Sequence, residues 1–163
     1  MGARPAISFE ELLRYDEEQS RHWRDLFARK PHLLKLEASP TSTVADYLTH
    51  LIGSEYRMGQ RLLGESMTPD QDLKLQTVED FFSLADRARE NLRQYLASSP
   101  ADFEVVKSYP SHTLGEIKAS PKKMMLHAVL HSSRHWAQLA RIIREHGVRI
   151  DWNSDVIFSK IIE

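Results

Sequence analysis

Three histidines stand four residues apart in the C-terminal part of the chain, at positions 127, 131 and 135. Residues at this spacing on a helix lie one turn apart on the same face, so two neighbouring imidazoles can share one metal ion. His127 and His135 are two turns apart, about 12 Å along the axis, which is too far for one ion to reach both easily. A single site would therefore use one neighbouring pair.

The apolar face of the predicted helix indicates which pair this is. A helical wheel at about 100° per residue centres that face on the positions Ala128, Ser132, Leu139 and Ile142. His131 and His135 lie at or inside its edge, whereas His127 lies further out. A single histidine at such an edge is usually a hydrogen-bonded structural residue. Two inward imidazoles each need a polar partner, so a metal site at His131 and His135 and a pair of structural histidines both stay open at this point.

A divalent ion needs at least a third protein ligand, usually from a facing helix. His50, near the start of a predicted second helix, is the natural candidate. The wheel places His50 away from the centre of that helix's apolar stripe and Glu55 inside the stripe. Either the site opens at the side of the helices, or Glu55 is the inward-facing group.

Four helical segments with start signals position these residues. Capping residues open each segment: Ser8 with Glu11, then Ser42 or Thr43, then Thr77 with Asp80, and Ser120 with Pro121. The segments are predicted to end near residue 28, at Gly64, near Ser98 and at His146 followed by Gly147.

The connections between the helices are less regular. Residues 31–40 are expected to form a loop, and residues 65–76 a polar crossover. Residues 103–118 alternate apolar with polar side chains, which predicts a short hairpin or an extended arm. One short helix is expected after Asn153. The whole pattern predicts an all-α, antiparallel four-helix bundle with a long connection between helices 2 and 3. We expect one domain over residues 1–163.

The composition limits which binding partners and which metal ligands we expect. The 22 basic and 23 acidic side chains nearly cancel, so no overall field would recruit nucleic acid or an anionic membrane. The chain has no cysteine, which leaves only nitrogen and oxygen ligands for a metal. No apolar run resembles a signal peptide or a membrane span, so we expect a cytoplasmic protein.

A family resemblance joins these observations. The pair His50 and Glu55, followed by SPKKMMLHAVLHSSRHWAQLARIIREHG at residues 120–147, resembles the DinB-like family, the DinB/YfiT-like metalloenzymes. The lengths of the helices and the tail at residues 151–158 extend the resemblance over nearly the whole chain. The family's last helix typically has His, three residues, His and then Arg-Gly-Gln. The resemblance implies that His50, His131 and His135 bind the metal.

The motif also departs from the family pattern. Gln138 keeps the glutamine, but Trp136 and Ala137 replace Arg-Gly. This leaves the ligands intact and puts in doubt any role of the arginine in binding an anionic substrate, unless Arg134 takes that role. His127 matches a histidine that often precedes the pair without being a ligand.

The resemblance implies one of two reactions on a small molecule. Three histidines leave an open coordination position, where zinc can lower the pKa of bound water to about 7 or polarise a carbonyl. The implied activity is metal-dependent hydrolysis, or transfer or isomerisation with a low-molecular-weight thiol, using zinc or nickel. We predict two catalytic residues, Glu55 as a general base or a supporting partner of the site, and Gln138 as a hydrogen-bond donor or orienting group.

The alternative to an enzyme is a protein without catalytic activity. The chain could be a dimeric small-molecule-binding or stress-response module with a structural or vestigial metal site. Leu126 and Leu130, opposite the apolar centre of the last helix, offer one surface for a homodimer, although they could equally cover the hairpin or the tail.

Overall fold

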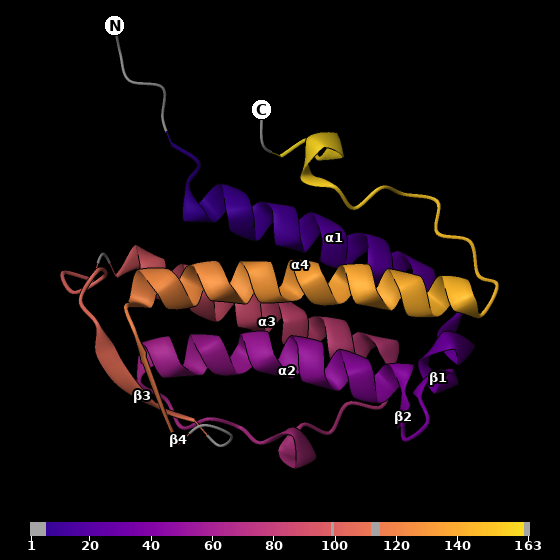
Figure 1. Cartoon of the computed structure of the whole chain (residues 1–163), viewed down its shortest axis with the longest axis horizontal. Helices are drawn as coiled ribbons and strands as arrows, with labels where there is room; N and C mark the ends of the chain where they lie inside the picture. Colours follow the sequence, from indigo (N-terminus) through magenta and orange to yellow (C-terminus); the bar gives the residue numbers. More distant parts are fainter. Residues whose placement is uncertain (1–5, 99, 112–114, 162–163) are drawn as a thin grey trace, which may run out of the picture.

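Four long helices make up most of the structure. The computed structural model describes residues 6–98, 100–111 and 115–161, and within them the long helices are α1 (Phe9–Arg29), α2 (Val44–Leu63), α3 (Val78–Ala97) and α4 (Pro121–Glu145). α2 packs most extensively against α3 and next against α4, while α1 contacts both α3 and α4. In Figure 1, α4 crosses the front of the molecule between α1 and α2, with α3 behind. None of the helices in the described ranges is long and apolar enough to cross a bilayer.

The predicted capping residues begin the helices. The side chains of Ser8, Thr43 and Thr77 each accept a hydrogen bond from the backbone three residues on, and an acidic side chain there completes a capping box. Thr43, and not Ser42, caps α2. Gly64 ends α2 with φ of 73°, a left-handed conformation that glycine adopts without strain. α4 ends at Glu145, one residue earlier than predicted.

Two small antiparallel sheets accompany the helices, so the all-α expectation is too narrow. Residues 31–40, expected to be a loop, instead contain a 3-10 turn, η1 (Pro31–Lys35), and the strand β1 (Glu37–Ser39), which pairs with β2 (Ser42–Thr43). The predicted hairpin is confirmed, with β3 (Lys107–Ser111) paired to β4 (Gly115–Ala119). The crossover after α2 contains the turn η2 (Asp70–Asp72), and the tail contains η3 (Val156–Phe158).

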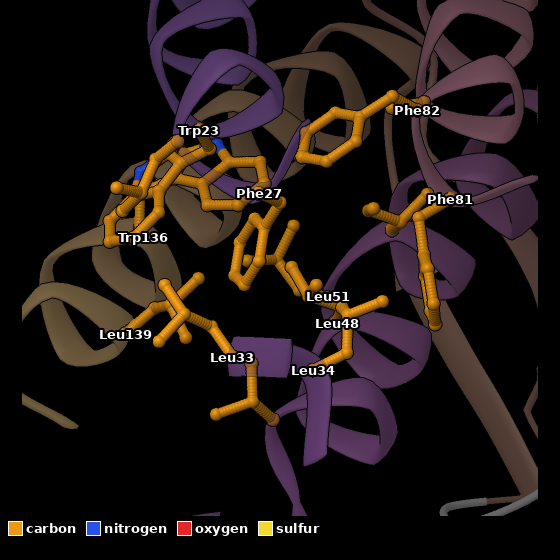
Figure 2. Packing of buried hydrophobic residues seen from close by; sticks show 14 of the residues in the cluster. Trp23, Phe27, Leu33, Leu34, Leu48, Leu51, Phe81, Phe82, Trp136 and Leu139 are labelled. Atoms are coloured by element: carbon orange, nitrogen blue, oxygen red, sulfur yellow. The ribbon is translucent and has the colours of Figure 1, made fainter. Parts of the chain in front are cut away.

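The apolar core falls into two clusters of buried side chains. One lies toward η1 and includes Trp23, Phe27, Leu48, Phe82, Trp136 and Leu139. Figure 2 shows the indoles of Trp23 and Trp136 side by side, and their rings are stacked with centroids 5.9 Å apart. The other lies toward the hairpin and includes Leu13, Leu62, Leu92, Tyr109 and Met125. Each long helix also contributes at least one buried polar residue.

Candidate metal centre and adjoining cavity

Histidines from two facing helices converge at the side of the helical core. His50 of α2 and the pair His131 and His135 of α4 place one ring nitrogen each within 4.8 Å of one another. The Nε2 atoms of His131 and His135 are 3.1 Å apart. The ring centroid of His50 lies 5.8 Å from that of His131 and 5.2 Å from that of His135. The structure therefore brings the three predicted ligands together, and we call them the histidine triad.

The spacing of the histidine triad fits a single ion. Zinc binds imidazole nitrogen at about 2.0–2.1 Å, so two nitrogens on one tetrahedral ion lie about 3.3 Å apart. The pair on α4 already has this separation. His50 is exposed, so its side chain is free to rotate and close the remaining gap. The exposure of His50 also answers the sequence ambiguity, because the site opens at the side of the helices.

The surroundings keep the α4 imidazoles neutral, as metal binding requires. Burial, followed by the neighbouring histidines, lowers the pKa of His131 to about 3. The pKa of His135 is also lowered, first by burial and then by the charge of His50. Protons therefore compete little with a metal for these two nitrogens at neutral pH.

Tyr47, which the sequence reasoning missed, orients His135. The Tyr47 hydroxyl lies 2.6 Å from His135 Nδ1 and donates to Gln138 Oε1 at 2.7 Å. A hydroxyl that donates to Gln138 accepts from His135, which puts the ring proton on Nδ1 and leaves the Nε2 lone pair facing His131. A partner of this kind fixes the orientation of a metal-binding histidine. One signal was available, since Tyr47 precedes His50 by three residues and so lies on the same helix face.

The two predicted catalytic residues have different positions. Gln138 lies beside the histidine triad, where it contacts Tyr47. Glu55 is 3% exposed and accepts a hydrogen bond from Ser132 Oγ at 3.0 Å. The structure does not bring Glu55 to the three histidines, and its role as a general base stays a prediction. Glu55 is also the inward-facing group of α2, so both sequence alternatives hold: the site opens at the side of the helices, and Glu55 faces the core.

Glu55 instead belongs to a cluster of charges inside the core. Asp16 and Arg89, each 2% exposed, form an ion pair with 3.3 Å between Arg89 Nη1 and Asp16 Oδ2. Trp136 Nε1 donates to the other oxygen of Asp16 at 3.4 Å. Burial and then the charge of Asp16 raise the pKa of Glu55 to about 8, against the opposing charge of Arg89. We call Asp16, Glu55 and Arg89 the buried ionic cluster.

A cavity of about 510 Å³ adjoins the histidine triad. His50 and His131 line one part of it, with His127 and the residues of α2 that follow His50 at helical spacing. The hairpin contributes Ser111 and Ile117, and the crossover contributes Pro69, Asp70 and Gln71. Its volume is within the range of small-molecule sites, about 300–1,000 Å³. His127 is thus a wall residue, whereas Arg134 does not line the cavity.

The crossover is fixed against α2 by specific contacts. The Gln60 side chain exchanges two hydrogen bonds with Thr68, at 2.9 and 3.0 Å, and Arg57 pairs with Asp70 at 2.5 Å. A Cβ on Gly53 would lie 2.9 Å from Leu73 and 3.0 Å from Asp70. The absence of a side chain at Gly53 therefore lets the crossover approach α2 closely and form one wall of the cavity.

Comparison with known proteins agrees with this geometry. A family model described as the DinB superfamily matches residues 9–139, which include the whole histidine triad, Tyr47 and Gln138. The chain belongs to the DinB superfamily. A comparison with curated proteins gave no match. Family membership and the three converging histidines together support divalent-metal binding, and they leave the identity of the metal open.

Proposed function

We propose that the chain is an enzyme that binds a divalent ion, zinc or nickel, through His50, His131 and His135. Its substrate is a small molecule that occupies the adjoining cavity. The observation that carries this proposal is the convergence of three imidazoles at the edge of a 510 Å³ cavity, with the lone pair of His135 directed by Tyr47. His50 and His131 line the cavity, so a substrate there has direct access to the ion.

Transfer that uses a low-molecular-weight thiol fits the site better than hydrolysis, because a metal-bound thiol is fully deprotonated, whereas metal-bound water with a pKa of about 7 is only partly so. A general base has to lie within reach of the proton it removes. Glu55 is enclosed in the core, and the carboxylate of the cavity wall, Asp70, is paired with Arg57. A bound divalent ion would supply the activation itself, since a thiol that coordinates a metal loses its proton. The chain's own residues would hold the ion, orient its histidine ligands and enclose the substrate.

Metal titration of tag-free protein tests the site. We would strip the metal with chelator, titrate zinc and nickel by calorimetry, and compare the parent protein with His131→Ala and His127→Ala. The parent and His127→Ala should each bind about one equivalent, whereas His131→Ala should lose at least about a hundredfold in affinity. His127 is the matched control because it lies one turn away on α4 and is outside the triad. Equal binding by all three proteins, or none, would refute the metal site.

Turnover on the metal-loaded protein then tests the reaction. We expect consumption of an electrophile to require an added thiol, and His131→Ala to abolish it. Turnover without thiol would favour the hydrolase.

One observation favours a dimeric module without catalysis. Leu126 and Leu130 are 42% and 59% exposed on α4, so neither the hairpin nor the tail covers them fully. A dimer in sedimentation that Leu130→Glu dissociates, without thiol-dependent turnover, would support that module.

A further inference from the structure

Arg61 is a partly buried cation for which the described residues supply no acidic partner. Its Nε donates to the carbonyl of Pro110 at 3.2 Å, and its Nη1 lies 3.8 Å from Met58 Sδ. Within residues 6–98, 100–111 and 115–161, no carboxylate lies within ion-pair distance of it. Arg57, one turn earlier, is paired with Asp70. Arg61 lines the same cavity as His50 and His131.

The surroundings hold the Arg61 side chain in place. The Pro110 carbonyl belongs to β3, and Figure 1 shows the hairpin passing the C-terminal end of α2. The Pro110 carbonyl occupies Nε, and Met58 Sδ is a weak acceptor for one N–H of Nη1, so one N–H each of Nη1 and Nη2 remains for a ligand. Two parallel N–H groups on one edge of a guanidinium match the two oxygens of a carboxylate.

The charges at the Arg61 end of the cavity favour one anionic group of a ligand there. Burial and the nearby charge of Arg57 lower the pKa of Arg61, so its cationic form is destabilised where it stands. Arg57 and Asp70 neutralise each other, which leaves one uncompensated positive charge from Arg61. A single negative charge on a ligand would remove this imbalance.

The position of Arg61 relative to the triad indicates a two-ended ligand. His50, Ser54, Arg57 and Arg61 line the cavity along one face of α2. His50 and Arg61 are separated by about 16 Å along the helix axis. Side chains on a helix lean toward its N-terminus, so the Arg61 guanidinium extends back toward His50 and shortens that span.

We propose that Arg61 is the carboxylate-binding residue of this cavity, so that the substrate carries a metal-binding group at one end and a carboxylate at the other. This inference rests on the proposed function, because the first end needs the ion at the histidine triad. The remaining NH groups of Arg61 would bind the carboxylate and set the distance between the two ends.

Thiol binding to the cobalt-substituted protein tests the inference without an activity assay. The probes are ω-mercaptocarboxylates of increasing chain length, each compared with the ω-mercaptoalcohol of equal length. The signal is the thiolate-to-cobalt charge-transfer band. The parent protein should prefer the carboxylate by about tenfold at the best length, since hydrogen bonds to charged groups are the strong ones. Arg61→Gln should reduce the preference to less than about threefold.

Two controls make the outcomes distinguishable. Arg29→Gln removes the same charge from an exposed site at the end of α1, where Arg29 donates to the Asp25 carbonyl, and it should keep the preference. Equal binding of carboxylate and alcohol by the cobalt-loaded parent would overturn the role of Arg61 and leave the metal site standing. If Arg61→Gln and Arg29→Gln lose the same part of the preference for the carboxylate, the preference depends only on net charge. This result would also overturn the role of Arg61. No cobalt spectrum in the parent would overturn the metal site and this inference together.

Discussion

The histidine triad and the buried ionic cluster meet on two helices, yet their surroundings are opposite. His50 and Glu55 both belong to α2, and on α4 the residues next to the triad, Ser132 and Trp136, hydrogen-bond to the cluster. On α4, His131 lines the cavity and His135 joins it in the triad, while the next residues, Ser132 and Trp136, are buried in the core. The triad opens at the side of the molecule and has no charged partner among the residues that the structure describes, so its lone pairs are available to an ion. The cluster is buried, so its groups pair with one another and, through Arg89, with Asp86 at the surface.

This difference shows how little sequence separation distinguishes a binding site from a structural one. Successive residues on a helix are rotated by about 100°, so one step moves a side chain from the cavity to the core. A buried polar group without a hydrogen-bond partner lowers the free energy of unfolding by about 1–3 kcal/mol, and a buried charge without a partner lowers it by more. The cluster therefore pairs Asp16 with Arg89 and raises the pKa of Glu55, whereas the exposed side of the triad needs no such compensation.

Removing the buried cation should have the largest effect. Arg89→Met leaves Asp16 buried without its ion-pair partner and should lower the free energy of unfolding by about 3–5 kcal/mol. Urea titration followed by circular dichroism measures this change. Arg24→Met is the matched control, since Arg24 pairs with Glu79 and Asp86 at the surface. It should cost less than about 1 kcal/mol.

The same variant tests whether the two clusters act separately. Folded Arg89→Met should keep its zinc affinity within about threefold, because Arg89 makes no contact with the histidine triad. If the variant fails to fold, Asp16→Asn combined with Arg89→Met removes both charges and should recover most of the loss. Two outcomes would contradict the separation of the histidine triad from the buried ionic cluster. One is an equal loss of unfolding free energy in Arg89→Met and Arg24→Met, and the other is loss of zinc binding in Arg89→Met.

Glu55→Gln should have a smaller, pH-dependent effect on stability. The folded pKa of Glu55, about 8, lies above the ordinary value of 4.5. Stability linked to this proton is therefore complete below about pH 4.5 and is lost as the pH rises through 8. Glutamine keeps the neutral form at every pH and can still accept from Ser132. The variant should match the parent near pH 4.5 and exceed its unfolding free energy by a growing margin as the pH rises to 8.

Unfolding titrations at several pH values measure that difference. Glu104→Gln is the control, because the exposed Glu104 pairs with Lys122 and its pKa is lowered. The free energy of unfolding of Glu104→Gln should not rise above that of the parent as the pH increases. A constant difference between Glu55→Gln and the parent from pH 4.5 to 8 would show that Glu55 is already ionised in the folded chain.

The features predicted from the sequence are those with local signals. The capping residues Ser8, Thr43 and Thr77 are followed three positions later by the acid that completes the box, so the helix starts could be placed closely. His131 and His135 could be paired because helix geometry fixes residues four apart. Strands of two and three residues, such as β1 and β2, are too short for a periodic pattern, and that sheet was missed.

The missed features depend on contacts between distant segments. Asp16 and Arg89 are 73 positions apart, and nothing near either residue predicts their pairing. Tyr47 has a detectable spacing from His50, but its bond to His135 required the packing of α2 on α4. The cavity is a further case, since the crossover and the hairpin form its walls.

Tyr47→Phe should give the smallest effect and a change specific to the triad. Without the hydroxyl, His135 Nδ1 loses its partner, and the ring is free to rotate and change its tautomer. Loss of such a partner typically costs 10–100-fold in metal affinity. We expect about tenfold for zinc, or about 1.4 kcal/mol, measured by competition with a chromophoric chelator. Unfolding of the metal-free protein should change by less than about 1 kcal/mol, because the hydroxyl is only partly buried.

The control for this substitution is Tyr15→Phe. The Tyr15 hydroxyl donates to the carbonyl of Ser154 in the tail at 2.5 Å, so its loss should leave zinc affinity unchanged. Gln138→Ala keeps the Tyr47 hydroxyl but removes its acceptor, and it should reduce the affinity by less than Tyr47→Phe does. If Tyr47→Phe binds zinc as tightly as Tyr15→Phe does, packing alone orients His135. The histidine triad would then be held in place by side-chain packing, as the core is. It would differ from the buried ionic cluster only in its exposure to solvent.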